Sequence, residues 1–321
     1  MTQLSFTLFG GFTVTLDGEP VTTFDSNKVR ALLAYLAVEA GRTHRRESLA
    51  ALLWPGYPDR SARTNLRNAL ANLRTAIGDR ETEPPFLLIT RETLQFNRES
   101  DHWLDVEVLE QTQKHVEQIP TGRLAEAADL YTGDLLAGFT LEDAVGFDDW
   151  SSATRERLRR QVLDLLGEVA DRLVADGDRE QALAYARRRV ELEPWLEAAQ
   201  RLLIRLLAET GQRSVALRQY RHCVRVLEEE LGAAPSAETT ALYEAVRATG
   251  PDLASAEASP VASAVPHLTT LPLPAFLDET EKPVIAERPV FVGREPELAR
   301  LDGYLDAALA GQGQVAFVVG G

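Results

Sequence analysis

Apolar and polar residues alternate along the first 24 positions of the chain. The stretches LSFTLFG and FTVTLDGEPV each place an apolar residue at every second position, which is typical of β-strands with one buried face. Asp17 and Gly18 interrupt the second stretch and predict a hairpin turn. The pattern therefore predicts a small antiparallel sheet at the N-terminal end.

The apolar spacing then changes to three and four residues, which predicts three helices in succession. Caps, glycines and prolines set their bounds. These expected bounds are Asp25 or Ser26 to Gly41, Thr43 to Pro55, and Pro58 to Gly78. The stretch FLLITRETLQF at 86–96 follows and predicts two strands joined by a tight turn at Arg91 and Glu92.

The third helix, PDRSARTNLRNALANLRTAIGD at 58–79, has two dissimilar faces. One side gathers alanine, leucine and isoleucine, which predicts that it is buried. The opposite side holds no acidic residue and consists of Arg60, Arg63, Thr64, Arg67, Asn68, Ala71, Arg74 and Thr75. Arginine neutralises phosphates, and Arg and Asn pair with guanine and adenine edges. A small residue at Ala71 would let the helix approach a DNA groove closely. An ordinary solvated helix face is the alternative, and the helix alone does not decide between them.

The order of elements favours the DNA interpretation. A compact bundle whose third helix is followed at once by a hairpin has the layout of a winged helix-turn-helix. Arg91 at the hairpin tip would then reach a minor groove or a phosphate. Arg45 and Arg46, near a helix end, are candidates for phosphate contacts. An exposed arginine without a DNA role is the alternative for each of these residues.

Charge is distributed unevenly along the chain, whose formal net charge is −15. Residues 106–321 hold 22 Lys and Arg against 36 Asp and Glu, whereas residues 42–80 hold eight arginines against three acidic residues. A basic segment in an acidic molecule indicates a local anionic partner, and the remainder of the chain should be repelled by DNA.

From about residue 105 to 249 the pattern is entirely helical and contains a repeat. GDREQALAYARRRV at 177–190 aligns with GQRSVALRQYRHCV at 211–224, an offset of 34 residues, which is the tetratricopeptide period. GRLAEAADLY at 122–131 resembles a degenerate earlier copy. In such repeats the glycine ends one helix and a small alanine lets the next helix approach closely, so we expect a stack of helix pairs.

Other features exclude several classes of protein. No apolar run reaches the length of a membrane helix, the N-terminus does not have the pattern of a signal peptide, and Cys223 is the only cysteine. These features predict a cytoplasmic protein without membrane association. The five histidines are scattered, and no catalytic or phosphate-binding motif is complete. We therefore expect no metal, no cofactor and no enzymatic activity.

The motifs described above resemble a known family. SNKVRALLAYLAVEAGRTHRRESLAALLWPG and SARTNLRNALANLRTAIGD are similar to the OmpR/PhoB-type winged helix of SARP-type bacterial transcriptional activators. LDVEVLE at 104–110 and EELGAAPSAETTALYEAV at 229–246 resemble the opening and close of the bacterial transcriptional activation domain (BTAD) of that family. The resemblance implies binding to promoter direct repeats by two protomers, with the BTAD pairing protomers and contacting RNA polymerase.

The last part of the chain carries a second resemblance. VFVGREPEL, a predicted helix and the strand QVAFVVGG look like the start of a STAND-type NTPase domain. The phosphate-binding lysine, the Ser or Thr for magnesium and the Walker B strand are absent from these 321 residues. We therefore interpret the sequence as truncated and expect this chain not to hydrolyse ATP.

Together these observations predict a mainly α protein with small β elements, in which a winged helix-turn-helix domain precedes a TPR-like all-α repeat domain. The expected parts are the DNA-binding domain at 1–104, the BTAD at 105–249, a Pro- and Ala-rich linker at 250–288, and the truncated NTPase segment at 289–321. The predicted function is sequence-specific transcriptional activation, with double-stranded DNA and RNA polymerase as partners and a homodimer on DNA. A helical-repeat scaffold without a specific DNA target is the alternative, although a scaffold has no need for an acid-free arginine face.

Overall fold

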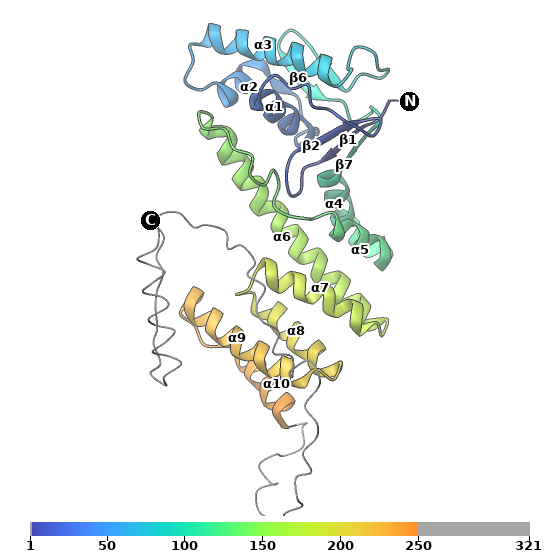
Figure 1. Ribbon diagram of the computed structural model, residues 1–321, viewed down its shortest axis with the longest axis vertical. Coiled ribbons are helices and arrows are strands. Elements are labelled where there is room, and N and C mark those ends of the chain that lie inside the picture. The colour runs from blue at the N-terminus through green and yellow to red at the C-terminus, as the bar shows by residue number, and fades with distance from the viewer. Residues whose placement is uncertain (1, 249–321) are drawn as a thin grey trace, which may run out of the picture. The chain divides into compact units, whose positions relative to one another are not determined.

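The computed structural model describes residues 2–248, which belong to one compact unit (Figure 1). The predicted linker at 250–288 and the predicted NTPase segment at 289–321 lie outside the described residues. Among the described residues, no helix is long and apolar enough to span a membrane.

The first sheet has four strands in the order β3-β2-β1-β7, where β1 is Leu4–Thr7, β2 Thr13–Leu16, β3 Glu19–Pro20 and β7 His102–Leu104. β1 pairs antiparallel with β2, as the alternating pattern predicted. The predicted turn is confirmed, since Asp17 and Gly18 have φ angles of 52° and 85°. β7 was not predicted. It runs parallel to β1, and three residues are too few to show alternation.

Three helices follow the first three strands: α1 (Asn27–Val38), α2 (Arg46–Leu53) and α3 (Asp59–Ala76). The bounds of α3 match the prediction, with Gly78 in the left-handed region at φ 64° just beyond its end. The expected ends of the first two helices were wrong. α1 already ends at Val38, before Gly41, and α2 begins only at Arg46.

The late start of α2 is caused by the second sheet. Its strands are β4 (His44–Arg45), β5 (Leu87–Ile89) and β6 (Thr93–Phe96), in the order β4-β6-β5. The predicted hairpin is thus confirmed as β5 and β6, the wing of the fold. His44 and Arg45 pair with Leu94 and Thr93 of β6, so these two residues form a strand rather than the first turn of a helix.

The predicted burial of one side of α3 is confirmed. Its buried residues are Ala62, Leu66, Ala69, Leu70 and Leu73, and Ile77 continues the row. They join the core formed with α1 and α2, because a stripe of this width can leave water only by packing on neighbouring helices. Burial of this side directs the polar side of α3 toward solvent.

The remainder of the described chain is mainly helical, as predicted, but residues 130–144 between α5 and α6 are not helical, and Leu135 there forms a β-bridge with Phe9 (Figure 1). Its helices are α4 (Asp105–Lys114), a short 3-10 helix (Val116–Gln118), α5 (Thr121–Asp129), α6 (Val145–Ala175), α7 (Arg179–Leu192), α8 (Glu197–Glu209), α9 (Arg213–Leu231) and α10 (Ala237–Ala248). From α6 to α10 each helix packs against the next one in the chain, which is the expected stacking of a repeat structure.

The 34-residue repeat is visible at equivalent points of this stack. Gly177 ends α6 at φ 85° and Gly211 ends α8 at φ 77°. Ala182 in α7 and Ala216 in α9 are fully buried, where larger side chains would separate the helices. The earlier copy is less regular than predicted, because Gly122 lies in the first turn of α5 and does not end a helix.

Candidate nucleic-acid interface

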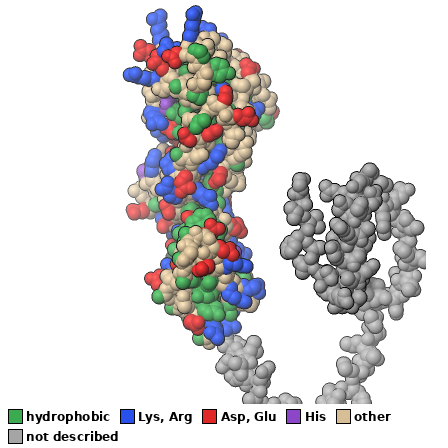
Figure 2. Space-filling view, turned by 90° about the vertical axis from the view of Figure 1, so that its left-hand side faces the viewer, with side chains coloured by type: hydrophobic (Ala, Val, Ile, Leu, Met, Phe, Trp, Pro, Cys, Tyr) green, Lys and Arg blue, Asp and Glu red, His purple; other side chains and the backbone are tan. Residues whose placement is uncertain are grey.

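The polar side of α3 is an exposed surface. Exposed residues on it are Arg60, Arg63, Thr64, Arg67, Asn68, Ala71 and Thr75, whereas Arg74 is half-buried. Arg60, Arg63 and Arg67 also line a shallow concavity with Asp59 and Thr64. In Figure 2, Lys and Arg side chains project from the end of the molecule at which Figure 1 places α3. The helix thus presents guanidinium groups to solvent over about two turns.

A second cavity joins this surface to the wing. Its volume is about 420 Å³, and it is lined by Arg45, Arg46, Glu47, Arg63, Leu66, Arg67, Arg91 and Glu92. The residues predicted separately on α3, at the start of α2 and at the hairpin tip therefore meet around one opening. Five arginines against two glutamates give this opening a positive field.

Backbone pairing holds the wing tip against the start of α2. The Arg46 amide donates a hydrogen bond to the Glu92 carbonyl over 2.8 Å, and the Arg46 Nε donates to the Thr90 carbonyl over 3.1 Å. The Thr90 hydroxyl oxygen accepts from the Glu92 and Thr93 amides and closes the turn. Arg45 and Arg91 remain exposed, whereas Arg46 is half-buried and its Nε is engaged by the Thr90 carbonyl.

One acidic side chain reaches the α3 surface from a neighbouring helix. Glu47 of α2 pairs with Arg63 over 2.8 Å, with both side chains more than half exposed. Exposed ion pairs of this kind stabilise a fold by about 0–1 kcal/mol. A phosphate could therefore replace Glu47 as the partner of Arg63 at little cost.

Arg74 has a partner that sequence spacing did not indicate. Its Nε donates to the Asp79 carboxylate over 2.7 Å, and Asp79 is fully buried. The other oxygen of Asp79 accepts from the Leu87 amide at the start of β5 over 2.9 Å. Arg74 therefore neutralises a buried carboxylate that connects α3 to the wing. Its predicted contact with DNA stays a prediction and would have to coexist with this pair.

We expect Arg74→Ala to lower the free energy of unfolding by about 1–3 kcal/mol, because the buried Asp79 would lose its charged partner. Arg60→Ala is the matched control, since Arg60 is exposed and has no ion pair among the described residues. Chemical denaturation followed by circular dichroism would measure both. Equal stability of the two variants would contradict a structural role for Arg74.

The hydroxyl protons of the two threonines on α3 are already donated within the helix. Thr64 Oγ1 donates to the Arg60 carbonyl over 2.9 Å, and Thr75 Oγ1 donates to the Ala71 carbonyl over 3.1 Å. Both bonds span four residues of the same helix. The two hydroxyl protons are therefore not free to be donated to a partner, whereas the hydroxyl oxygens can still accept a hydrogen bond and the methyl groups can contact a thymine methyl group.

A buried carboxylate joins this part of the chain to the helices that follow it. Asp105, the first residue of α4, is almost fully buried and accepts hydrogen bonds from the amides of Leu8, Phe9 and Val106 over 2.6, 2.9 and 2.8 Å. Burial raises the pKa of Asp105 to about 6, although the backbone donors favour the ionised form. Asp105 belongs to the LDVEVLE motif, but no local pattern indicated this role.

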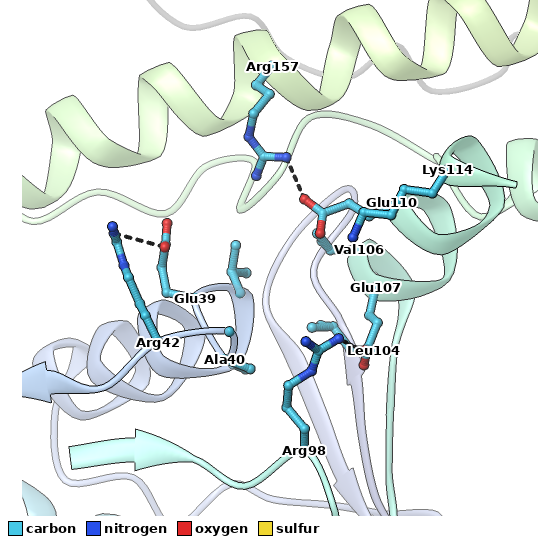
Figure 3. A pocket seen from close by; sticks show the side chains of 13 residues that line it. Glu39, Ala40, Arg42, Arg98, Leu104, Val106, Glu107, Glu110, Lys114 and Arg157 are labelled. Carbon is cyan, nitrogen blue, oxygen red and sulfur yellow. Dashed lines mark hydrogen bonds and ion pairs between the residues drawn. The ribbon is translucent and has the colours of Figure 1, made fainter.

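A cavity of about 390 Å³ lies at the same junction (Figure 3). Each of its three carboxylates is paired with an arginine, Glu39 with Arg42, Glu107 with Arg98 and Glu110 with Arg157, and Lys114 also lines the cavity. Figure 3 shows that these pairs come from the end of α1, the segment before β7, α4 and α6. Because each carboxylate has an arginine partner, we assign this cavity to the junction rather than to a ligand site. Among residues 2–248, no cluster of His, Cys, Asp and Glu has the arrangement of a metal site.

Comparison with known proteins agrees with this architecture. The winged helix is followed by stacked helices, of which the first begins within the LDVEVLE segment. Residues 104–247 match the family described as bacterial transcriptional activator domain. The resemblance to SARP-type transcriptional activators is thereby confirmed.

Two curated relatives are regulatory proteins. Regulatory protein AfsR from Streptomyces coelicolor is 25% identical over 313 residues, covering 95% of this chain and 29% of that protein. Transcriptional regulatory protein EmbR from Mycobacterium tuberculosis is 26% identical over 248 residues, covering 76% of this chain and 63% of EmbR. The chain therefore spans less than two thirds of the length of either relative.

A solved structure supports the fold. Mycobacterium tuberculosis EmbR in complex with a low affinity phosphopeptide matches 78% of this chain and 66% of that chain, with a TM-score of 0.59 and 22% sequence identity. The predicted fold class, a winged helix-turn-helix followed by a TPR-like helical domain, is confirmed.

Proposed function

We propose that the chain is a sequence-specific DNA-binding transcriptional activator that places α3 in a major groove. The observation that carries this proposal is the continuity of the exposed arginine surface of α3 with the basic cavity formed by Arg45, Arg46 and Arg91. An isolated solvated helix face would not require two further elements to direct arginines to the same place. The regulatory relatives support the same function.

The positions of these residues on α3 and the wing suggest which of them would contact bases and which would contact phosphates. Arg67 and Asn68 lie in the middle of the exposed face, where their forked side chains would meet base edges. Arg60, near the start of α3, and Arg91, on the wing, lie at its margins and would contact phosphates or the adjacent minor groove. Ala71 is exposed and small, so it leaves room for close approach of the helix.

The helical region would serve protein partners. By family resemblance, it would pair two protomers on promoter direct repeats and contact RNA polymerase. Its net negative charge opposes contact with DNA, which supports a role toward proteins. The role that we infer for the whole chain is regulatory and not enzymatic.

Selection of bound sequences from random duplex DNA, using the full chain, tests the function directly. We expect enrichment of two copies of one short site in the same orientation, with their centres separated by about one helical turn of 10–10.5 base pairs or a multiple of it. Failure to enrich any sequence would favour the helical-repeat scaffold with no specific DNA target.

Single substitutions would separate base reading from phosphate contact. Arg67→Ala and Asn68→Ala should each weaken binding to the selected site by about 1–3 kcal/mol while leaving binding to random DNA nearly unchanged. Arg60→Ala should weaken both and reduce the dependence of binding on salt concentration. Gel-shift titrations at several salt concentrations would measure these effects. Arg67 is wrongly assigned if its substitution weakens both DNAs equally.

A further inference from the structure

Helix α9 carries a row of arginines on its outer side. Ala216, Cys223 and Leu227 face inward and are buried. Arg218, Arg221 and Arg225 lie three and four residues apart on the exposed side. The row spans about 10 Å along the helix, from a rise of about 1.5 Å per residue.

These arginines differ from others in the helical region. Carboxylate partners within 4 Å are present for Arg157, Arg160, Arg172, Arg179, Arg188, Arg201 and Arg247. No carboxylate of residues 2–248 pairs in this way with Arg218, Arg221 or Arg225 of α9, or with the exposed Arg187 of α7. Arg205 of α8 is likewise exposed without a carboxylate partner within 4 Å among residues 2–248, but it is the single such arginine on its helix, whereas α9 carries three in a row.

A groove with an apolar floor adjoins this row. It has a volume of about 340 Å³ and is lined by Arg187, Val190, Glu191, Pro194, Leu203, Leu207, Val215, Gln219 and His222. Val190, Leu203 and Leu207 form its buried floor. His222 lies on α9 between the arginine row and the groove, so the two features form one surface. Figure 2 shows hydrophobic side chains flanked by Lys and Arg over the lower part of the molecule, where Figure 1 places α9.

We propose that this surface, which we name the α7–α9 groove, binds an acidic segment of a partner protein that also carries apolar side chains. Carboxylates spaced over two helical turns, or on alternate residues of an extended strand, match a row of about 10 Å. The planar guanidinium group binds carboxylates in a bidentate manner. The apolar floor would take a leucine or phenylalanine from the same segment, as helix-in-groove binding requires.

The same features argue against DNA as the occupant. A phosphate backbone offers no apolar group for the floor, and Glu191 within the groove would repel it. The proposal is independent of the DNA-binding function assigned to α3, because it uses residues of α7, α8 and α9 alone.

The probe is a fluorescent synthetic peptide of sequence EELFEELL, titrated with the full chain and followed by fluorescence anisotropy. Two further peptides replace either every glutamate with lysine or every apolar residue with serine. We expect the acidic apolar peptide to bind at least tenfold more tightly than either of them and to weaken as salt is raised. Equal binding of all three peptides, or no binding of the first, overturns the proposal.

Charge reversal in the arginine row tests whether the peptide binds at the α7–α9 groove. The double variant Arg218→Glu and Arg221→Glu should lose at least tenfold in peptide affinity, since both residues are exposed and their replacement leaves the core intact. Arg205→Glu, at an exposed arginine of α8 outside the groove, should bind the peptide as the parent does. If the double variant keeps peptide affinity but loses affinity for random duplex DNA, the surface is a nucleic-acid contact and the proposal fails.

Discussion

Replacing Asp105 with alanine should lower the free energy of unfolding by about 2–4 kcal/mol. Its carboxylate is the acceptor for the amides of Leu8 and Phe9, and both amides are buried with it. A buried donor left without an acceptor costs about 1–3 kcal/mol. Thermal or chemical denaturation of the full chain would measure the loss. Asp101→Ala is the control. Asp101 is an exposed aspartate directly before β7, and its replacement should change the free energy of unfolding little.

The difference in the free energy of unfolding between the parent and Asp105→Ala should depend on pH. Burial raises the pKa of Asp105 to about 6 from an ordinary value near 3.8, so the folded state holds the proton more tightly than the unfolded chain does. The stabilisation from this proton is complete below pH 3.8 and disappears as pH rises through 6. The parent should therefore exceed Asp105→Ala in stability by more at pH 4.5 than at pH 7. A difference that grows with pH would show that the folded-state pKa is lowered.

The second large effect concerns DNA. Removing Arg60, Arg63 and Arg67 together by alanine substitution should lower affinity for the selected site by at least about 100-fold, since each contact contributes on the order of 1–3 kcal/mol. All three side chains are exposed, so the fold should keep its stability. Fluorescence anisotropy with a labelled duplex at constant salt would measure the loss.

A charge-matched control uses three exposed arginines of the helical region. Alanine at Arg123, Arg160 and Arg179 removes the same charge from α5, α6 and α7. Affinity for the selected site should stay within about twofold of the parent, because these residues lie outside the proposed DNA contact. Equal losses in the two triple variants would mean that net charge, and not the α3 surface, determines binding.

The spacing of apolar residues was sufficient to predict the elements that bury a continuous face. The apolar stripe of α3 and the alternation in β1 and β2 were predictable because each repeats over several residues within one segment. The paired glycines at 177 and 211 were predictable for a similar reason, since a helix end has the same local requirement in each repeat. The exposed arginine side of α3 followed directly from its buried side.

Pairings between distant segments could not be predicted in this way. β4 and β7 have two and three residues, and only their partners β6 and β1 make them strands. The pair between Arg74 and Asp79 depends on the turn after α3. The meeting of Arg45, Arg46 and Arg91 at one cavity depends on the β4–β6 pairing. The sequence thus identified the candidate DNA-contacting residues, but not which of them share a cavity or already have a structural partner.

The segment that follows β1, residues 8–10, is hydrogen-bonded to residues beyond Leu104 at more than one place. Besides the Asp105 carboxylate, the Gly10 amide donates to the Asp134 carbonyl and the Leu136 amide donates to the Leu8 carbonyl. A gene fragment that stops at codon 104 would delete the Asp105 carboxylate, the Asp134 carbonyl and the Leu136 amide, and would leave their partners at residues 8–10 without them. Exchange of the winged-helix domain between regulators, in the laboratory or in evolution, should therefore succeed only when about thirty residues that follow position 104 are transferred together with it.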